Sequence, residues 1–384
     1  MKKILIFLCM AAMLMTGILL SPSVSTSGEE ASQRTVFDIT DYGAVGDGVT
    51  DCTAAIQQAL DDAGKVQGAV VVPSGKYLTG PLKMPAYTTL RGDAAWSFSY
   101  DGGSILIYNG AESDVPGFLD ITGAYGCAIM GLCFNGANKG EAMNGIYLCW
   151  DKYNGGVEED TPRIETCRVS EFTGNGIHLE KVWCFSLRHS MTTNNKGAGL
   201  YIDGFDGFIL DNMFSGNQNH GILGGPTASS LTITGNRIEW NKLGGMWIPY
   251  GDSINFTGNF VDRAYGPAVQ LGGPLCYARD VTITGNVFRR CGCLVEVEYD
   301  TEYDSCSLFL ENTNNVVVTG NTFRYGVFDT GYGPEEPLYD IYLSYSTAVI
   351  IQSNVMYHGA KKESIVYDGR GDCIIKDNIS HFDE

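Results

Sequence analysis

The stretch Thr232-Ile233-Thr234-Gly235-Asn236 decides the fold, because its pattern recurs along the chain. The full copies, which end at Asn236, Asn259, Asn286 and Asn321, have β-favouring residues, a small residue and then an asparagine, and degenerate copies end at Asn212, Asn354 and Asn378. The asparagines lie 24, 23, 27, 35, 33 and 24 residues apart, at Asn212, Asn236, Asn259, Asn286, Asn321, Asn354 and Asn378. Ser190 and Cys167 continue the series towards the N-terminus at steps of 22 and 23 residues. Such a unit, with short alternating strands and no helical periodicity, predicts an all-β protein, a right-handed parallel β-helix (solenoid).

The repeated asparagine has a physical explanation that does not involve catalysis. Asparagine tolerates a left-handed backbone, and its side-chain amide can hydrogen bond to the asparagine one turn above and one turn below. Each turn buries its apolar side only by stacking on its neighbours, about 4.8 Å apart. We therefore expect a ladder of asparagines that stabilises one corner of the solenoid.

The segment 36–91 differs from the later repeats and is predicted to begin the solenoid. Apolar residues recur at helical spacing over residues 52–63, with Thr50 or Asp51 as the N-cap. Two short strands are expected after this helix, at 69–73 and 75–78. The end of a solenoid exposes an unpaired strand edge and an apolar cross-section. The helix is therefore predicted to be the N-terminal cap.

Charge excludes one class of partner. The chain has 384 residues, and 25 Lys and Arg against 44 Asp and Glu give a formal net charge of −19. A protein without an excess of cations cannot displace phosphate counterions, so nucleic acid is not expected as a partner. The same charge favours solubility and argues mildly against a polyanionic ligand.

Residues 1–27 have the pattern of a secretory signal peptide. Lys2 and Lys3 precede an apolar run over residues 4–20, and a small polar stretch follows. An uncleaved membrane anchor is the alternative, because about 17 apolar residues could just span a bilayer. We expect a secreted, extracellular protein that does not contact the membrane after cleavage. Its parts would be a linker at 28–35 and a single β-helix domain at 36–384, with the cap and first turns at 36–91 and further turns at 92–384.

The cysteines do not form a recognisable framework. Of twelve cysteines, Cys9 lies in the signal segment, which leaves eleven. Export permits disulfide bonds, but no spacing fits a disulfide framework or a zinc site, and Cys291 and Cys293 are too close for the usual ligand pair. We expect them to be small buried apolar side chains in the core, and we expect no metal site.

The run from Phe37 to Leu60 carries a family resemblance. Its segment Tyr42-Gly43-Ala44-Val45-Gly46-Asp47-Gly48, followed by Asp51, resembles the N-terminal signature of the pectate-lyase-like right-handed β-helix superfamily, which includes relatives of glycoside hydrolase family 28. The resemblance implies a secreted carbohydrate-active protein that binds glycan along the outside of the solenoid, as a monomer or a homotrimer. The resemblance does not assign catalytic residues to this chain. The Asn-Thr-Asp, Asp-Asp, Gly-His-Gly and Arg-Ile-Lys motifs of family 28 are not intact, and Asn219-His220-Gly221 is a fragment of the third.

Alignment on the asparagine gives a register for the strand that follows it. The residue two positions later is apolar in turn after turn and should point inward, at Phe214, Ile238, Val261, Phe288 and Phe323. The residue three positions later should then point outward. This outward column reads Ser215, Glu239, Asp262, Arg289 and Arg324.

The outward column places Glu239 beside Asp262 and Arg289 beside Arg324. A solvated charge ladder would alternate in sign, because like charges on neighbouring strands destabilise the pairing. A carboxyl group beside a carboxylate holds its proton more readily, as a general acid requires. Glycoside hydrolysis commonly uses two carboxyl groups about 5–9.5 Å apart. We therefore predict Glu239 and Asp262 as a catalytic pair, with a solvated ladder or a cation site as alternatives.

Residues around this column are predicted to bind substrate. Sugar rings stack on aromatic side chains, and arginines bind hydroxyl or carboxylate groups or orient a catalytic carboxylate. The same register on the next strand places five side chains outward, those of His178, Tyr201, Leu223, Trp247 and Gln270. The predicted substrate-binding residues are Arg289, Arg324, Trp240, Trp247, Arg263, Tyr201, Gln270 and His178. For Tyr201 and Trp247 the alternative is an ordinary surface aromatic residue.

Two long turns interrupt the repeat. Insertions in solenoids become loops on one face, often the binding face, so residues 296–304 and 328–337 are predicted to be such loops. The first is rich in carboxylates and could hold Ca²⁺, although it lacks the spacing of known calcium motifs. A solvated acidic loop is the alternative.

Three functions remain open at this point. The first is an enzyme that cleaves glycosidic bonds of an extracellular polysaccharide or oligosaccharide by paired-carboxylate acid/base catalysis. The second is a polysaccharide lyase acting on a uronate-containing glycan, with Arg289 or Lys242 as base and Ca²⁺ held by Asp262 and Glu239. The third is a non-catalytic glycan-binding surface protein. No dinucleotide or phosphate-loop motif occurs, so we expect no organic cofactor.

Overall fold

The computed structural model describes residues 35–93, 97–98, 102–150, 160–293, 304–325 and 337–381. All of them belong to one compact unit, residues 34–384. The predicted signal peptide 1–27 lies outside the described residues, as do almost all of the linker 28–35 and of the segments 296–304 and 328–337. Among the described residues, no helix combines the length and the apolar character needed to span a membrane.

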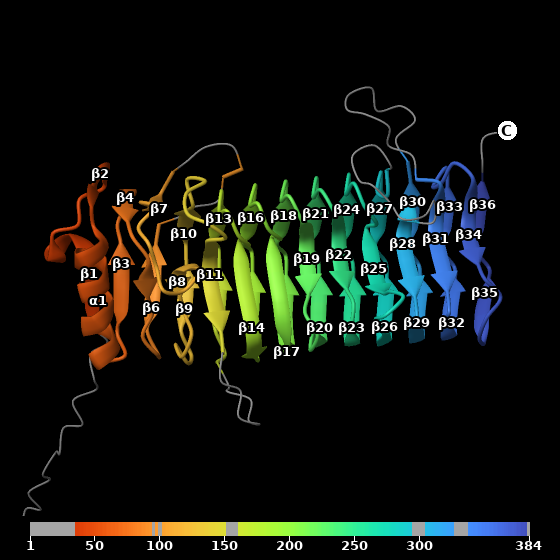
Figure 1. Ribbon diagram of the computed structural model, residues 1–384, viewed down its shortest axis with the longest axis horizontal. Coiled ribbons are helices and arrows are strands. Elements are labelled where there is room, and N and C mark those ends of the chain that lie inside the picture. Colours follow the sequence, from red (N-terminus) through yellow and green to blue (C-terminus); the bar gives the residue numbers. More distant parts are fainter. Residues whose placement is uncertain are drawn as a thin grey trace, which may run out of the picture. The chain divides into compact units, whose positions relative to one another are not determined.

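Two of three columns of stacked strands form one sheet (Figure 1). The first column contains β5 (Leu82–Lys83), β8 (Gly117–Asp120), β11 (Asn144–Cys149), β14 (Ile177–Trp183), β19 (His220–Gly224), β22 (Gly244–Ile248), β25 (Val269–Gly272), β28 (Cys306–Glu311), β31 (Tyr339–Ser344) and β34 (Glu363–Tyr367). The second column contains β1 (Val36–Asp38), β3 (Ala69–Val72), β6 (Thr89–Gly92), β9 (Ala128–Met130), β12 (Arg163–Glu165), β15 (Ser186–Arg188), β20 (Ser229–Thr234), β23 (Asp252–Thr257), β26 (Ala278–Thr284), β29 (Thr313–Thr319), β32 (Thr347–Gln352) and β35 (Cys373–Lys376). The long strand β17 (Leu200–Leu210) runs through both columns and joins them.

The third column is a sheet of its own, with 13 strands. It contains β2 (Asp47–Asp51), β4 (Gly75–Thr79), β7 (Ser104–Tyr108), β10 (Leu132–Asn135), β13 (Arg168–Ser170), β16 (Met191–Thr193), β18 (Met213–Ser215), β21 (Arg237–Glu239), β24 (Phe260–Asp262), β27 (Val287–Arg289), β30 (Thr322–Arg324), β33 (Val355–Tyr357) and β36 (Ile379–His381). Strands one turn apart pair in parallel in all three columns, as in β18–β21, β19–β22 and β20–β23. The predicted parallel β-helix is therefore confirmed.

The residues predicted to point inward fill the inside of the solenoid. All five are at most 1% exposed, namely Phe214, Ile238, Val261, Phe288 and Phe323. Phenylalanines of successive turns stack on one another, with 6.4 Å between the ring centroids of Phe256 and Phe288 and 5.1 Å between those of Phe288 and Phe323. Burial of each such side chain contributes about 1.5–3 kcal/mol to stability. The inward half of the predicted register is confirmed.

The predicted asparagine ladder runs between the second and third columns. Asn236 Nδ2 donates a hydrogen bond to Asn259 Oδ1 at 3.0 Å and to the carbonyl oxygen of Ile209 at 2.8 Å. The backbone N–H and Nδ2 of Asn212 donate in turn to Asn236 Oδ1. The pattern continues through Asn286, Asn321, Asn354 and Asn378.

A second asparagine ladder, which the sequence analysis missed, lies between the third and first columns. Asn195 Nδ2 donates to Asn217 Oδ1 and Asn217 Nδ2 donates to Asn241 Oδ1, both at 2.9 Å. All three side chains are fully buried. Each follows a member of the first series by five residues, so the spacing was an available signal. This ladder fixes the corner that leads into the first column.

The N-terminal turns carry the predicted helix. It is α1 (Thr53–Lys65), which buries Ile56 and Leu60 and packs against the 3-10 helix η1 (Ile39–Tyr42) and β3. The predicted N-cap was wrong, because Cys52 takes that position. Asp51 still supports the helix start, since its Oδ1 accepts from the Thr53 N–H at 2.8 Å.

None of the eleven described cysteines forms a disulfide bond. Seven are buried, as predicted, namely Cys52, Cys127, Cys133, Cys167, Cys291, Cys293 and Cys306. Burial raises the pKa of the Cys127 and Cys167 thiols to about 12, which keeps them protonated and unreactive. Cys184 is exposed and does not fit the prediction.

A carboxyl group in β31, that of Asp340, is buried and forms no ion pair with the described residues. Asp340 is fully buried, and among the described residues neither of its oxygens has a hydrogen-bond partner of normal geometry. The group packs on Gly359, where a Cβ atom would lie 2.1 Å from Asp340 Oδ1. Burial raises the pKa of the Asp340 carboxyl group well above its ordinary value, and the nearby Ser364 opposes this shift. Asp340 therefore keeps its proton to a higher pH in the folded protein than in the unfolded chain.

We expect Asp340 to make the protein less stable as the pH rises. The folded state holds this proton more tightly than the unfolded state does. The free energy of unfolding should therefore fall by about 1.4 kcal/mol per pH unit, from the unfolded pKa of about 3.9 up to the raised folded pKa. Asp340→Asn should remove this contribution. Denaturant unfolding of both proteins at several pH values measures it, and a stability difference that does not change with pH would contradict the assignment.

Candidate functional site

The predicted carboxylate column lies on the third column of strands and has the predicted register. Glu239 pairs with Asp262, Asp262 with Arg289, and Arg289 with Arg324. The two carboxylates are thus neighbours on adjacent turns. However, Glu239 is only 7% exposed and Asp262 only 3% exposed. Both lie at the corner that leads into the first column, not on an open face.

Arginine side chains bind both oxygens of Asp262 and one oxygen of Glu239. Arg290 Nε donates to Asp262 Oδ1 at 2.6 Å, and Arg290 Nη2 donates to Asp262 Oδ2. Arg237 Nε donates to Glu239 Oε2 at 2.8 Å. The bidentate partner of Asp262 is therefore Arg290, the residue that follows Arg289. A buried, bidentate ion pair is typical of a structural contact. A catalytic role for Glu239 and Asp262 stays a prediction.

The backbone at this corner explains why an outward position is buried. Trp240, Arg263 and Arg290 have φ angles of 59°, 50° and 53°, in the left-handed region. The chain turns at these residues, and the turn brings Arg290 over Asp262. The Arg263 guanidinium lies 4.5 Å from the centroid of the Trp240 ring. Two predicted substrate-binding residues thus contact each other.

The structure does not bring the remaining predicted residues to this corner. His178, Tyr201, Trp247 and Gln270 lie on the first column, whereas Glu239, Asp262, Arg289 and Arg324 lie on the third. The four first-column residues do point outward in one row, as the register predicted. The expectation of one site containing both groups was wrong, because a corner of the solenoid separates the two sheets.

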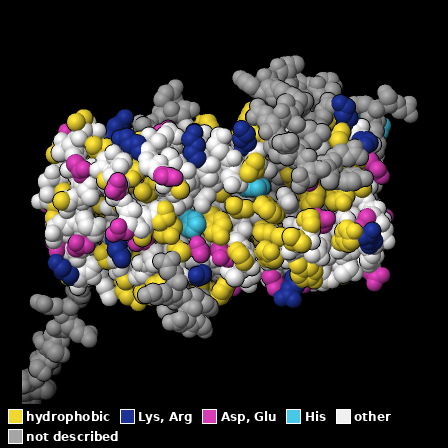
Figure 2. Space-filling model, viewed as in Figure 1, with side chains coloured by type: hydrophobic (Ala, Val, Ile, Leu, Met, Phe, Trp, Pro, Cys, Tyr) yellow, Lys and Arg dark blue, Asp and Glu magenta, His cyan; other side chains and the backbone are white. Residues whose placement is uncertain are grey.

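The row on the first column is rich in aromatic rings, and we call it the aromatic row. It consists of Tyr147, His178, Tyr201, Leu223, Trp247, Gln270, Phe309 and Tyr342. The ring centroids of Tyr147 and His178 lie 5.1 Å apart, and those of His178 and Tyr201 lie 4.6 Å apart. Figure 2 shows hydrophobic side chains gathered over this face, with acidic side chains beside them. Such rings are suited to contact the apolar face of a sugar.

Carboxylates follow two residues further along the same strands, in what we call the acidic row. It begins with Cys149, Glu180 and Asp203 on consecutive turns. Glu180 and Asp203 are direct partners in the strand register, so about 4.8 Å separates their backbones. The Glu180 side chain is 30% exposed, whereas Asp203 is 7% exposed. Sequence analysis missed this pair, although the alternation that placed His178 and Tyr201 outward also applies two residues later.

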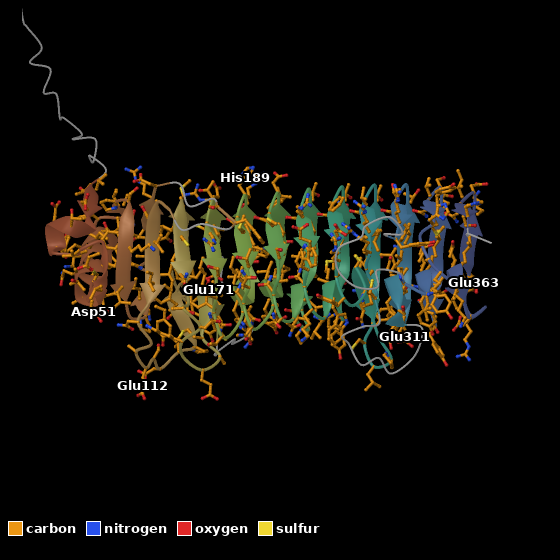
Figure 3. All side chains as sticks on the ribbon, turned by 90° about the horizontal axis from the view of Figure 1, so that it is seen from above. Asp51, Glu112, Glu171, His189, Glu311 and Glu363 are labelled. Carbon is orange, nitrogen blue, oxygen red and sulfur yellow. The ribbon has the colours of Figure 1, made fainter. Side chains whose placement is uncertain are left out.

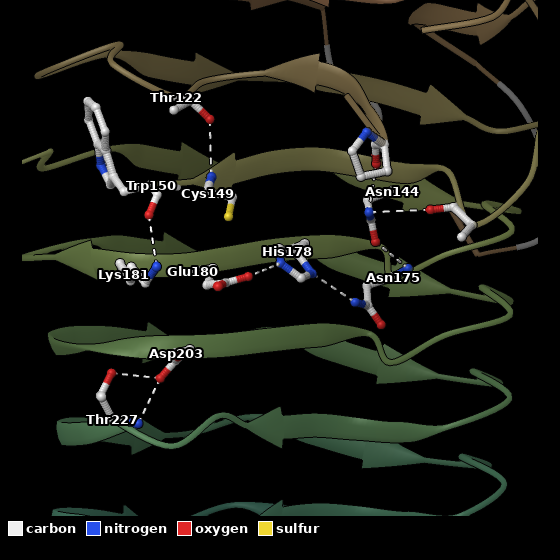
Figure 4. Close-up of polar contacts among 12 residues, drawn as sticks. Thr122, Asn144, Cys149, Trp150, Asn175, His178, Glu180, Lys181, Asp203 and Thr227 are labelled. Carbon is white, nitrogen blue, oxygen red and sulfur yellow. Dashed lines mark hydrogen bonds and ion pairs between the residues drawn. The ribbon is translucent and has the colours of Figure 1, made fainter. Parts of the chain in front are cut away.

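A hydrogen-bonded chain positions Glu180 (Figure 4). Asn175 Oδ1 accepts from the Ala198 N–H at 2.8 Å, so Asn175 Nδ2 is the donor that contacts His178 Nδ1 at 3.1 Å. His178 Nδ1 is then an acceptor, and the Nε2–H points to Glu180 Oε2 at 3.3 Å. Burial lowers the pKa of His178, while the Glu180 carboxylate opposes this shift. A neutral His178 therefore donates to Glu180.

Asp203 is held from the next turn. The N–H and Oγ1 of Thr227 donate to Asp203 Oδ1 at 2.7 and 2.6 Å, and Oδ2 takes no part in these bonds. Gly225 allows the approach, since a Cβ atom there would lie 2.5 Å from Asp203 Cβ and 2.7 Å from Tyr201 Oη. Burial raises the pKa of Tyr201 to about 12, and the charges of Asp203 and Glu180 add to the shift. Two carboxyl groups in such different surroundings can divide acid and base roles.

Neighbouring turns brace the start of the acidic row. The Cys149 N–H donates to Thr122 Oγ1 at 3.1 Å, and Lys181 Nζ donates to the carbonyl oxygen of Trp150 at 2.9 Å (Figure 4). Trp150 Nε1 donates to the Asp160 carboxylate at 3.1 Å.

In the part of the chain that the structure describes, no three His, Cys, Asp or Glu side chains are grouped so as to hold a metal ion.

Comparison with known families agrees with this architecture. Residues 36–109 match the family described as rhamnogalacturonase A/epimerase, pectate lyase-like, and residues 144–273 and 175–334 match the right handed beta helix region. The chain belongs to the pectate-lyase-like right-handed β-helix superfamily. Within this superfamily the described turns form a right-handed parallel β-helix with an N-terminal capping helix.

The curated relatives are distant. Mannuronan C5-epimerase AlgE5 of Azotobacter vinelandii is 26% identical over 64% of this chain and 26% of its own length. Alginate lyase 7 of the same organism is 25% identical over 48% of this chain and 23% of its own length. An exopolygalacturonase of Zea mays is 24% identical over 52% of this chain and 51% of its own length. The chain thus spans about a quarter of the first two relatives.

Solved structures share the fold at low identity. The A-module of the A. vinelandii mannuronan C-5 epimerase AlgE6 has a TM-score of 0.66 at 18% identity and covers 91% of this chain and 100% of its own. DFA-IIIase from Arthrobacter chlorophenolicus has a TM-score of 0.65 at 14% identity and covers 89% of this chain and 94% of its own. These matches establish the fold and leave the reaction to be argued from the site.

Proposed function

We propose that this protein is a carbohydrate-active enzyme that acts on a polysaccharide bound along the first column. The observation that carries the proposal is the placement of Glu180 and Asp203, neighbours on adjacent turns, directly beside the aromatic row. Curated relatives support the substrate class, since their names include mannuronan epimerases, an alginate lyase and an exopolygalacturonase. The outward rings would hold sugar rings, and the carboxyl groups would act on the bond between them.

The reaction that this geometry favours is cleavage of a glycosidic bond. Paired carboxyl groups about 5–9.5 Å apart serve this chemistry, one as acid and the other as nucleophile or base. Glu180 is the more exposed of the two and would protonate the leaving oxygen. The buried Asp203, oriented through Oδ1 by Thr227, would present Oδ2 to the sugar or to a water molecule. His178 would be a positioning residue that fixes Glu180.

A second candidate reaction is proton transfer at a uronate, as in a lyase or an epimerase. The names of the epimerase and lyase relatives favour it. Coulomb repulsion argues against it, because Asp120, Glu180 and Asp203 lie on the first column and would face a chain of negative charges. Arg289, predicted as a lyase base, belongs to the third column and does not contribute to this face. If the protein were a lyase, Ca²⁺ would assist the reaction. For the hydrolase we propose that no cofactor is needed.

Location and assembly are proposed on the sequence alone. Residues 1–27 would direct the chain out of the cell, so the substrate would be an extracellular glycan. We further propose that the secreted protein is a monomer or a homotrimer.

Product analysis on a panel of neutral and acidic polysaccharides tests the proposal. We expect the purified protein to release new reducing ends from a neutral glycan without an ultraviolet-absorbing product. Unsaturated, absorbing ends would identify a lyase instead. Deuterium uptake from heavy water without chain cleavage would identify an epimerase. Glycan binding without any of these changes would show that the protein is a non-catalytic binder, and the proposal would be wrong.

A further inference from the structure

The acidic row has a gap after Asp203, and a further carboxylate, Glu311, lies beyond the gap. The strand pairs Ile202–Gly224, Ile248–Leu271 and Gly272–Glu311 give the register beyond Asp203. Extended by one residue past each of the first two pairs, it places Gly225, Pro249 and Gly272 between Asp203 and Glu311. Glycine is required at 272, because its φ is +69° and a Cβ atom there would lie 2.0 Å from the carbonyl oxygen of Glu311. No long side chain therefore projects from this row between Asp203 and Glu311. Four steps of about 4.8 Å place Glu311 about 19 Å from Asp203 along the solenoid.

A pocket lies at the far end of this gap. Its volume is about 350 Å³, and it is lined by Pro274, Glu311, Asn312 and Tyr345. The Tyr345 side chain is 59% exposed, and one face of its ring is covered by the Arg370 guanidinium at 4.2 Å from the centroid. Asn312 Nδ2 donates to the carbonyl oxygen of Cys276 at 2.6 Å, which fixes the orientation of its amide. An apolar ring face beside carboxyl and amide oxygens is the set of groups that binds a sugar.

Apolar side chains connect the two ends of the gap. On the aromatic row, Trp247, Phe309 and Tyr342 lie alongside it, with Phe309 and Tyr342 ring centroids 5.1 Å apart. On the other side, the turns that follow β22 and β25 expose Tyr250 and Leu275, at 43% and 90%. An extended glycan lying over Gly225 and Gly272 would contact both borders.

We propose that the pocket at Glu311 and Tyr345 is a distal subsite, which binds a sugar unit of the same polysaccharide chain whose reacting bond lies at Glu180 and Asp203. This inference rests on the proposed function and adds a chain-length requirement to it. Several sugar units must separate the reacting bond from the unit in the pocket, so the substrate is a polymer or a long oligosaccharide.

The groups around the pocket suit a sugar hydroxyl. Burial raises the pKa of Glu311, and the charges of Asp304 and Asp368 raise it further. Asp368 accepts hydrogen bonds from Ser344 Oγ and the Tyr345 N–H, and its Oδ2 lies 3.8 Å from Arg370 Nε. A sugar hydroxyl can donate a hydrogen bond to Glu311 in either charge state of this carboxyl group, and it can accept one from the protonated form. A neutral sugar therefore fits the distal subsite.

Binding of oligosaccharides of increasing length tests the subsite. The ligands are neutral gluco- and fructo-oligosaccharides, and Kd is measured by calorimetry on the Glu180→Gln protein, so that the ligand stays intact. Adding Tyr345→Asn or Glu311→Gln should weaken binding of the longest ligands about fivefold to tenfold. Binding of ligands too short to reach the pocket should not change. The matched control is Tyr357→Asn, because Tyr357 is 52% exposed but lies on the third column.

The outcomes separate this inference from the function it rests on. Equal weakening for short and long ligands would show a structural role and overturn the subsite. Unchanged binding of long ligands, or a wild-type protein that binds none of these ligands, would also overturn it. If the length effect appears while Glu180→Gln retains full activity, the subsite stands and the assignment of the catalytic pair is wrong.

A second control variant lies far from the pocket. Figure 3 shows that Glu311 and His189 lie on opposite sides of the solenoid, so His189→Ala controls for effects of a substitution on folding.

Discussion

Replacing Glu180 by glutamine is expected to lower kcat about 10²- to 10⁴-fold on the glycan that the wild-type protein cleaves. Glutamine keeps the size and a hydrogen-bond acceptor for His178 Nε2, at 3.3 Å in the wild type, but it cannot transfer a proton. The expected loss is the usual contribution of a general acid or base. Asp203→Asn should cause a loss of similar size, because Thr227 can still hold the side chain while the nucleophile or base is removed.

The measurement is the initial rate of product release under saturating glycan, with the unfolding midpoint recorded for each variant. Glu112→Gln is the matched control, since this side chain is exposed and lies outside the site. Its rate should equal that of the wild type. Glu180→Gln with wild-type kcat, or a loss that follows only a loss of folded protein, would contradict the assigned role.

Asn236→Ala is expected to lower the free energy of unfolding by about 3–5 kcal/mol. The side chain makes hydrogen bonds to Asn259 and Ile209 and accepts two from Asn212, all of them buried. Alanine leaves several buried donors and acceptors without partners, each at a cost of about 1–3 kcal/mol. Part of this cost is recovered if neighbouring turns relax.

Denaturant unfolding followed by circular dichroism measures this difference. Asn255→Ala provides the comparison, because Asn255 is exposed on β23, where its Oδ1 accepts hydrogen bonds from the hydroxyl groups of Thr257 and Thr282. That variant should lose less than about 1 kcal/mol. Similar losses for both variants would show that the ladder does not hold the corner of the solenoid.

The fold was predictable because one physical requirement repeats in every turn. Each turn must bury an apolar residue such as Phe288 and must satisfy the backbone at a corner, which Asn286 does. A spacing of 22–24 residues and the alternation of the following strand then fix which side chains point inward. The capping helix was also predictable, although its start was placed before Thr53.

The site was predictable only in part. Strand alternation tells which side chains point outward, but a side chain that points outward can still be buried by a neighbouring turn. Glu239 and Asp262 have the predicted register, but the left-handed turn brings Arg290 over Asp262. Arg290 is 28 residues away in sequence, and only the stacking of turns reveals the contact. His178 and Tyr201 have the outward register that was predicted, whereas Glu180 and Asp203 were not predicted. Strand alternation places these two carboxylates outward as well, two residues further along the same strands.

The central claim is that substrate binds and reacts on the first column of strands. A crystal structure of the Glu180→Gln protein with a bound oligosaccharide tests this claim most directly. The account predicts sugar rings over the aromatic row at Tyr201 and Trp247, with a glycosidic oxygen within hydrogen-bond distance of residue 180. Sugar bound instead on the third column, against Arg289 and Arg324, would contradict the claim.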